Sequence, residues 1–347
     1  MFQTFPTDYI HVVVCDERVL SAGGRLKRLD HYWYSLNPVA LLLLPLSWLF
    51  CALVVLRRLA YRQGWLQSER LPVPVVVVGN ITVGGSGKTP LVIWLAQFLR
   101  GQGKRPGIVS RGYGGLAAQW PQPVEADSDP RLVGDEPVLI AQLAACPMAV
   151  GPDRVAAARL LLQQHDCDIL ISDDGLQHYR LVRDVEIAVL DGVRRLGNGF
   201  CLPAGPLREA PDRLGSVDLR VGNGRAEEGE HLMELLPGAV MHLRDGTACS
   251  LEDFRGRRVH AVAGIGNPPR FFQLLRDHGI EVIEHAFPDH YRYTVADVQF
   301  GDGLPVLMTA KDGVKCRTYG DDHLWSVAVS ACLPDTFGAR LLSLLAR

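Results

Sequence analysis

The sequence predicts an α/β protein with a doubly wound parallel sheet, a second and smaller α/β domain, and a membrane-associated helix near the N-terminus. Short β-branched runs alternate with helical patterns, as they do in doubly wound sheets. These runs lie near residues 75–78, 107–110, 148–150, 168–172 and 186–190. A second alternation follows Gly238 and predicts the smaller domain, with strands near 258–263, 281–286 and 305–309.

Composition and charge limit the classes of function. The chain has 347 residues, 48% of them hydrophobic, which is enough for about two folded domains. Its 36 basic and 38 acidic residues give a net charge of −2, so no general basic field is available for nucleic acid. Its eight cysteines are scattered and form no C-x-x-C pair, which is typical of reduced thiols rather than a structural zinc site. We therefore expect no nucleic-acid partner and a local site for any anionic ligand.

The predicted membrane-associated helix rests on an uncharged run, PVALLLLPLSWLFCALVVL, from Pro38 to Leu56. As a helix it would reach about 28 Å, close to the thickness of the hydrocarbon core. Aromatic residues flank it on both sides, and Arg57 and Arg58 end it. Basic residues are balanced on the two sides, and Pro45 interrupts the run, so the helix either spans the bilayer or lies along it. The alternative is a buried core helix.

A glycine-rich loop follows the first predicted strand, in the sequence VGNITVGGSGKTP over residues 78–90. Strand, loop, Gly-Lys-Thr and helix in this order predict a P-loop and therefore a P-loop NTPase-like sheet. The residues expected to bind nucleotide are Thr82, Val83, Gly84, Gly85, Ser86, Gly87, Lys88 and Thr89. Backbone N–H groups would surround the phosphates, Lys88 would reach the β- and γ-phosphates, and Thr89 would offer its hydroxyl to Mg²⁺. The pattern departs from the motif at Thr82, where glycine is usual.

A second acidic contribution to the metal is expected from the end of a neighbouring strand. Residues 168–172 form such a strand, and Asp173 and Asp174 follow it directly. Ligands bind at the carboxyl ends of strands in open α/β sheets, so both carboxylates are candidate metal ligands together with Thr89. Asp173 is the preferred one. A turn formed by Asp-Asp-Gly is the structural alternative.

Several motifs together resemble one family, the tetraacyldisaccharide 4'-kinases, which are the lipid A 4'-kinases of Gram-negative bacteria. The similarity runs from about residue 35 to about residue 317. Besides the P-loop, the motifs are SRGYGG (110–115), VGDEP (133–137), DDGLQHYRLVRDVEI (173–187), PAGPLRE (203–209), GIGNPPRFF (264–272), DHYRY (289–293) and MTAKDGVKC (308–316).

The resemblance implies a specific reaction. ATP would donate its γ-phosphoryl group to the 4'-hydroxyl of an acylated glucosamine disaccharide 1-phosphate, giving lipid IV(A). Lipid A biosynthesis places this reaction at the cytoplasmic face of the inner membrane, so membrane lipid would be a second partner. The cofactors expected are ATP and Mg²⁺. The residues alone point to phosphoryl transfer beside a membrane; the identity of the acceptor comes from the resemblance.

A base that accepts the hydroxyl proton is also needed. Asp135 stands before a helical pattern, where a carboxylate serves either as an N-terminal cap or as the base. The residues alone favour the cap, and the resemblance favours the base. His290 is a candidate for orienting Asp135 across a domain cleft, or is simply solvated. With Lys88, these two residues make up the predicted catalytic set.

Other polar residues have a binding and a structural interpretation. Arg111 and Tyr113 flank glycines after a strand and either contact a ligand or form a surface turn. Gln177 and His178 either face the acceptor or pack, and Lys311 ends a strand near the expected cleft. Arg208 and Glu209 are expected to pair with each other.

We divide the chain into an unassigned extension (1–34), the membrane-associated helix (35–66), a P-loop kinase domain (67–235) and a smaller C-terminal α/β domain (236–347), with the active site between the last two. The alternative function is a membrane-associated P-loop GTPase or nucleotide switch. Guanine recognition usually requires an N-K-x-D element, which the sequence lacks. A non-catalytic binding module is less favoured still, because Lys88, Thr89 and the aspartate pair are all present.

Overall fold

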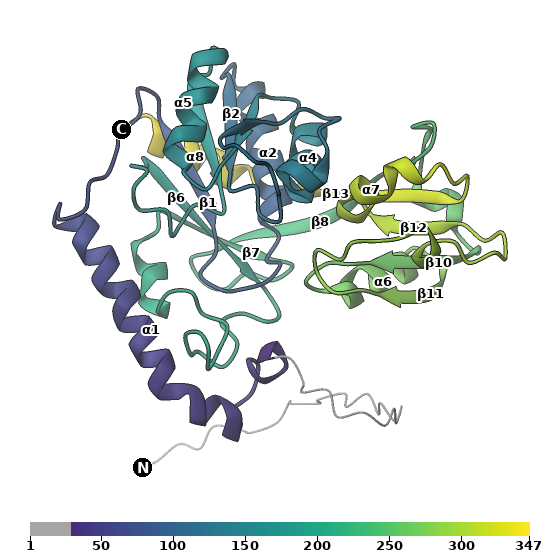
Figure 1. The fold of residues 1–347 in the computed structure, drawn as a ribbon, viewed down its shortest axis with the longest axis horizontal. Coiled ribbons are helices and arrows are strands. Elements are labelled where there is room, and N and C mark those ends of the chain that lie inside the picture. Colours follow the sequence, from purple (N-terminus) through teal and green to yellow (C-terminus); the bar gives the residue numbers. More distant parts are fainter. Residues whose placement is uncertain (1–28) are drawn as a thin grey trace.

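The computed structural model describes residues 29–347, so most of the predicted extension over 1–34 lies outside the described residues. The first domain contains a parallel sheet in the order β7-β6-β1-β5-β2-β4, with the short antiparallel strand β3 at its edge (Figure 1). Its strands are β1 (Val75–Gly79), β2 (Pro106–Ser110), β3 (Gln122–Pro123), β4 (Met148–Val150), β5 (Ile169–Asp173), β6 (Val185–Asp191) and β7 (Leu219–Asn223). Strands β1, β2 and β5 are buried along their whole length, which explains their continuous apolar runs.

Helices cover both faces of this sheet, as the doubly wound prediction requires. They are α2 (Lys88–Gly101), α3 (Pro130–Val133), α4 (Asp135–Ala144), α5 (Arg154–Gln164) and α8 (Asp335–Leu345). One hydrophobic cluster joins the sheet to α2, α4 and α8, and a second joins it to α5. The two clusters are the cores of the two faces.

The second domain is smaller and carries the C-terminal strands. Its strands are β8 (His231–His242), β9 (Ala248–Cys249), β10 (Arg258–Ala263), β11 (Glu281–Ala286), β12 (Val306–Thr309) and β13 (Leu324–Cys332), and its helices are α6 (Pro268–Asp277) and α7 (Ala310–Cys316). Strand β8 pairs in parallel with β7 and then antiparallel with β13, so one strand belongs to both domains. The boundary that we place between residues 235 and 236 falls inside β8. Helix α8 then returns to the first domain, where Phe337 and Leu341 are fully buried.

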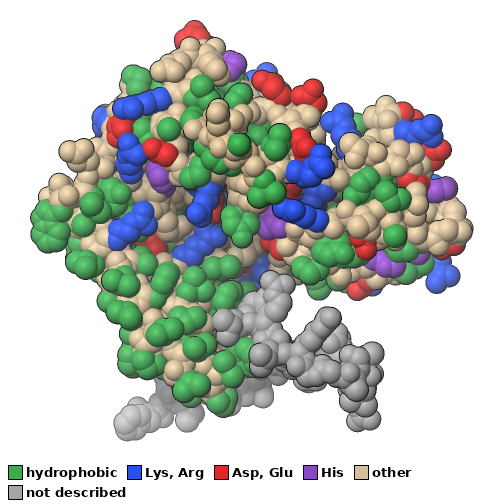
Figure 2. Space-filling model, in the orientation of Figure 1, with side chains coloured by type: hydrophobic (Ala, Val, Ile, Leu, Met, Phe, Trp, Pro, Cys, Tyr) green, Lys and Arg blue, Asp and Glu red, His purple; other side chains and the backbone are tan. Residues whose placement is uncertain are grey.

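Helix α1 (Pro38–Arg62) runs along the side of the first domain (Figure 1). Its inward stripe includes the buried residues Ala40 and Ser47, and the Ser47 hydroxyl donates a hydrogen bond of 2.6 Å to the Cys201 carbonyl. Its outward face is apolar and open: Leu42 is 82% and Trp48 65% exposed, and hydrophobic side chains cover this surface in Figure 2. The alternative of a buried core helix is therefore wrong. Within residues 29–347, α1 alone is long and apolar enough to cross a membrane.

Candidate active site

The predicted P-loop connects β1 to the N-terminus of α2. Gly84 and Gly87 have φ values of 106° and 94°, which side chains rarely adopt, so glycine is required at both positions. Thr82 is different: it has no positive φ, and it forms a β-bridge with Leu207. The departure from the motif at Thr82 therefore leaves the loop conformation intact.

Two cations hold Asp174 just beyond the end of β5. The Lys88 ammonium lies 3.5 Å from Asp174, and Arg208 lies 3.0 Å from each of its carboxylate oxygens. Burial alone would raise the pKa of Asp174, but Lys88 and Arg208 outweigh it and hold the pKa at about 2. The sequence-based expectation that Arg208 pairs with Glu209 is therefore wrong. Glu209 is instead bound by Gln177, Tyr179 and Arg213.

Asp173 is the last residue of β5 and is buried. It accepts a hydrogen bond of 2.9 Å from the Ser110 hydroxyl. Burial, followed by the negative charges of Glu136 and Asp174, raises its pKa to about 6. A divalent cation bound beside Asp173 would favour the ionised form of this carboxylate. Within residues 29–347 no three acidic, histidine or cysteine side chains are grouped so that they could hold a metal ion.

Asp135 and His290 meet across the two domains. Asp135 opens α4, and His290 lies in the loop after β11; the His290 Nδ1 atom is 3.1 Å from each carboxylate oxygen. Burial raises the pKa of Asp135, but the hydrogen bond from His290 and the charges of Lys311 and Lys315 lower it to about 2. The hydrogen bond to Asp135 raises the pKa of His290 in turn. Both shifts favour the carboxylate–imidazolium pair. The N-cap of α4 is Gly134, so the capping alternative for Asp135 does not hold.

Helix α7 of the second domain supplies two lysines to this pair. The Lys311 ammonium lies 2.9 Å from both Glu136 and Asp289 and 3.4 Å from the second ring nitrogen of His290. Lys315 lies 3.8 Å from Asp135 and 2.7 Å from the fully buried Asp312. The prediction that Lys311 faces the cleft is confirmed, whereas the sequence does not single out Lys315 or Glu136.

Residues from three strand ends surround these carboxylates. Tyr113 is exposed and places its ring 5.1 Å from the His290 ring. Gln177 donates to the Asn80 carbonyl at 3.1 Å and therefore supports the start of the P-loop. Arg154, which sequence reasoning missed, is buried and donates to the Asp174 carbonyl at 3.3 Å. The sequence does contain a signal for Arg154, because this residue begins a helix shortly after β4, at the edge of the sheet where ligands bind.

The second domain also contacts the P-loop itself. Arg194, paired with Asp191, donates 2.6 Å and 3.0 Å hydrogen bonds to the carbonyls of Gly85 and Gly266. These two glycines approach so closely that a Cβ on Gly266 would lie 2.8 Å from the Gly85 nitrogen. A cavity of about 480 Å³ opens beside this contact, lined by Thr89, the apolar residues Ile93 and Phe271, and others. It is large enough for part of a nucleotide.

Comparisons with known proteins agree with one another. A family model described as tetraacyldisaccharide-1-P 4'-kinase matches residues 39–346. A protein of Nitrosococcus oceani named tetraacyldisaccharide 4'-kinase is 56% identical over 90% of this chain and 93% of its own length. A protein of Alkalilimnicola ehrlichii with the same name is 52% identical over 93% and 98%. The crystal structure of LpxK from Aquifex aeolicus in complex with ATP has a TM-score of 0.75 and 30% identity, over 88% of this chain and 99% of that one.

Proposed function

The chain belongs to the tetraacyldisaccharide-1-P 4'-kinase family, and from that premise we propose which residues carry its reaction. It is an ATP-dependent kinase of lipid A biosynthesis. The γ-phosphoryl group of ATP is transferred to the 4'-hydroxyl of a tetraacyldisaccharide 1-phosphate, and the product is lipid IV(A). The observation that carries our residue assignment is the Asp135–His290 pair, which two domains build beside the P-loop.

Lys88 and the P-loop amides bind the triphosphate. The N–H groups of residues 84–89 line the helix N-terminus, where anions are favoured. Lys88 now neutralises Asp174 at 3.5 Å, and the β- and γ-phosphates of ATP would compete for it. Arg208 remains on Asp174 and keeps that carboxylate ionised when Lys88 turns to the phosphates.

Thr89, Asp173 and Asp174 are the proposed ligands of Mg²⁺. When bound, Mg²⁺ would neutralise negative charge on the triphosphate during phosphoryl transfer. Ser110 and the strand end fix the Asp173 carboxylate in place.

Asp135 is the proposed base. Its carboxylate accepts the proton of the 4'-hydroxyl as the sugar oxygen forms a bond to the γ-phosphorus and the bond to the ADP oxygen breaks. His290 orients the carboxylate through its Nδ1 atom, and the charge of Lys311 helps to keep the carboxylate ionised. Glu136 and Asp289 keep the Lys311 ammonium in place, so His290 has a cation on its other side.

We place the enzyme at the cytoplasmic face of the inner membrane, with α1 lying along the bilayer rather than crossing it. The inward stripe of α1 is bonded to the domain from Ser47 to Arg58, where Arg58 donates to Ser216 at 2.7 Å. A helix that crossed the bilayer would draw this polar segment into the hydrocarbon core, where unpaired polar groups are costly. An immersed outward face would bring the acceptor lipid to the active site.

Transfer of labelled phosphate from ATP tests the proposal. The full chain in detergent should label the disaccharide lipid, and Lys88→Ala should not. A switch or GTPase would instead hydrolyse nucleotide equally with and without the lipid. Label in inorganic phosphate alone would therefore contradict the proposed residue roles.

A further inference from the structure

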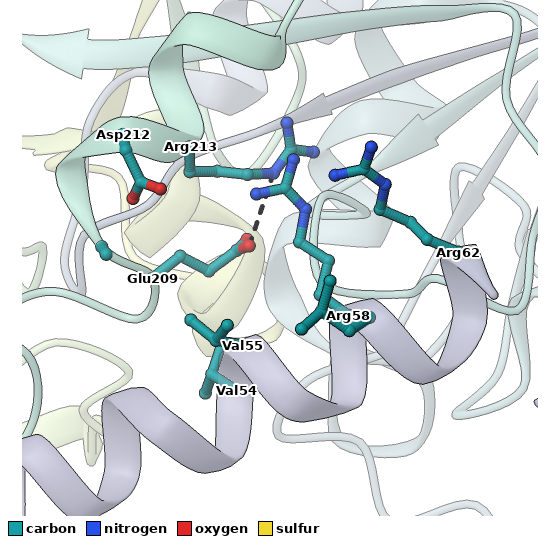
Figure 3. Close-up of a pocket in the computed structure, with 9 residues that line it drawn as sticks. Val54, Val55, Arg58, Arg62, Glu209, Asp212 and Arg213 are labelled. Carbon is teal, nitrogen blue, oxygen red and sulfur yellow. Dashed lines mark ion pairs between the residues drawn. The ribbon is translucent and has the colours of Figure 1, made fainter.

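A small pocket lies between the last turns of α1 and the short 3-10 helix η2 (Pro211–Ser216), away from the P-loop. Its volume is about 180 Å³. Val54 and Val55 form an apolar wall, and the guanidinium groups of Arg58, Arg62 and Arg213 converge at the other end (Figure 3).

Arg213 is balanced by the protein. It is buried, donates to Glu186 at 2.6 Å and forms an ion pair with Glu209 at 3.4 Å, the dashed line in Figure 3. Glu209 also accepts a hydrogen bond of 2.5 Å from the Tyr179 hydroxyl, so its carboxylate is already bound within the protein.

The two arginines that α1 contributes to the pocket, Arg58 and Arg62, are not balanced in this way. Among residues 29–347, Arg58 bonds only to the neutral Ser216 hydroxyl, at 2.7 Å. Arg62 makes no hydrogen bond or ion pair with any residue from 29 to 347. Asp212 also lines the pocket and offsets at most one of the two charges. Like charges brought together without a counter-charge repel, so the pocket is arranged for an anion from outside the chain.

The side of α1 on which the pocket lies identifies the source of that anion. The outward apolar face extends from Leu41 to Leu59, whereas Arg58 and Arg62 border the pocket on the inward side of the helix. Trp65 follows and is 73% exposed, as is usual for tryptophan at the level of lipid headgroups. When α1 lies along the bilayer with its outward face immersed, the pocket on its inward side is therefore at the level of the lipid phosphates.

We propose that this pocket binds the phosphate of an anionic glycerophospholipid of the bilayer, separately from the acceptor of the kinase reaction. Two guanidinium groups suit a phosphate because each offers paired N–H donors. The wall of Val54 and Val55 packs against the glycerol and the first methylene groups. The bound lipid sets the depth and orientation of α1, and it takes no part in phosphoryl transfer.

The test uses the full chain in detergent and a short-chain phosphatidylglycerol below its critical micelle concentration, with phosphatidylcholine as the neutral comparison. Wild type should bind phosphatidylglycerol more tightly. The double variant Arg58→Gln/Arg62→Gln should lose about 25-fold in affinity, at about 5-fold for each charge. Arg58→Lys/Arg62→Lys should still lose about 5-fold, because lysine keeps the charge but not the paired donors.

Arg57→Gln is the matched control, because Arg57 stands on the same turn but stacks on Tyr61 and Tyr179 outside the pocket. It should bind the short-chain lipid like wild type. Melting temperatures verify that all variants fold, and kcat and KM for the acceptor in phospholipid-free detergent should stay unchanged. Equal binding of both lipids, or an equal loss in Arg57→Gln, would overturn the proposal. A raised acceptor KM in Arg58→Gln/Arg62→Gln would assign the pocket to the acceptor phosphate and also overturn it, leaving the kinase assignment intact.

Discussion

Replacing Asp135 by asparagine keeps the size and shape of the side chain and removes its charge. In the structure this carboxylate is 7% exposed, lies 3.1 Å from His290 through both oxygens and has Lys315 at 3.8 Å. An amide in this place cannot accept the 4'-hydroxyl proton. We expect kcat to fall by about 10²- to 10⁴-fold, which corresponds to about 3–5 kcal/mol in the barrier.

The same substitution has a smaller and separable effect on stability. The pKa of Asp135 is about 2 in the folded protein, against an ordinary value of 3.8, which makes the carboxylate worth about 2 kcal/mol near neutral pH. Because the folded pKa is the lower one, this contribution is complete above pH 4 and disappears as the pH falls towards 2. The difference in stability between wild type and Asp135→Asn should therefore shrink between about pH 4 and about pH 2.

Steady-state kinetics and thermal melting of Asp135→Asn, His290→Ala and the double variant separate the two effects. The double variant should lose much less than the product of the single losses, because the two residues act as one unit. Asp135→Asn should also lower the pKa of His290 in an NMR titration, since the hydrogen bond to Asp135 is what raises it. Full turnover in Asp135→Asn, or strictly multiplicative losses, would refute the base assignment.

Three further predictions follow from the geometry. Lys88→Ala should lose at least about 10²-fold in kcat because its charge is needed most at the transferring phosphoryl group; near wild-type turnover with MgATP would show that the P-loop assignment is wrong. Gly266→Ala places a Cβ 2.8 Å from the Gly85 nitrogen, so it should hold the second domain away from the P-loop. We expect a lower kcat with little change in melting temperature. Gly256→Ala controls for general strain in this domain, because Gly256 has no neighbour within 4 Å but has a φ of 71°. Replacing Leu42, Leu46 and Leu49 by glutamine should release the protein from vesicles without changing kcat in detergent, because these side chains point away from the domain. Unchanged vesicle binding would mean that α1 does not enter the bilayer.

Strands β3 and β7 of the first domain could not be predicted, because β3 has only two residues and β7 carries Arg220 and ends in Gly222 and Asn223. Strands β1, β2, β4, β5 and β6 could be predicted because they are buried and mostly apolar. Strand β8 could not, because Pro237 and Gly238 in its middle are typical of a turn. The structure accommodates them through an irregular register opposite, between Val327 and Val329 of β13. Proline is tolerated at such an irregularity, where a ladder hydrogen bond is already missing. Nothing in the local sequence of β8 signals this long-range compensation.

The candidate site could be predicted where its residues follow strands, as Asp173 and Asp174 do, because strand ends meet at one edge of a parallel sheet. The prediction failed where it relied on adjacency. Arg208 and Glu209 follow each other in a bent segment without regular structure, and each side chain finds its partners on another element. One reaches Asp174 and the other reaches Tyr179 and Arg213. Contacts between domains, such as those of Arg194, have no signal in local sequence.

The contacts between the domains link the base to the nucleotide loop. His290 reaches Asp135 only when the second domain lies against the first, and the same approach brings Gly266 to Gly85 under Arg194. Arg270 of α6 adds a second connection through Asn223, whose amide donates to the Ser86 carbonyl at 3.0 Å. The carbonyls of Gly85 and Ser86 are thus held by Arg194 and Asn223, each of which also bonds to a group of the second domain. A displacement of the second domain would separate His290 from Asp135 and Gly266 from Gly85 at the same time, so the proposed base and the P-loop would lose their contacts across the interface together.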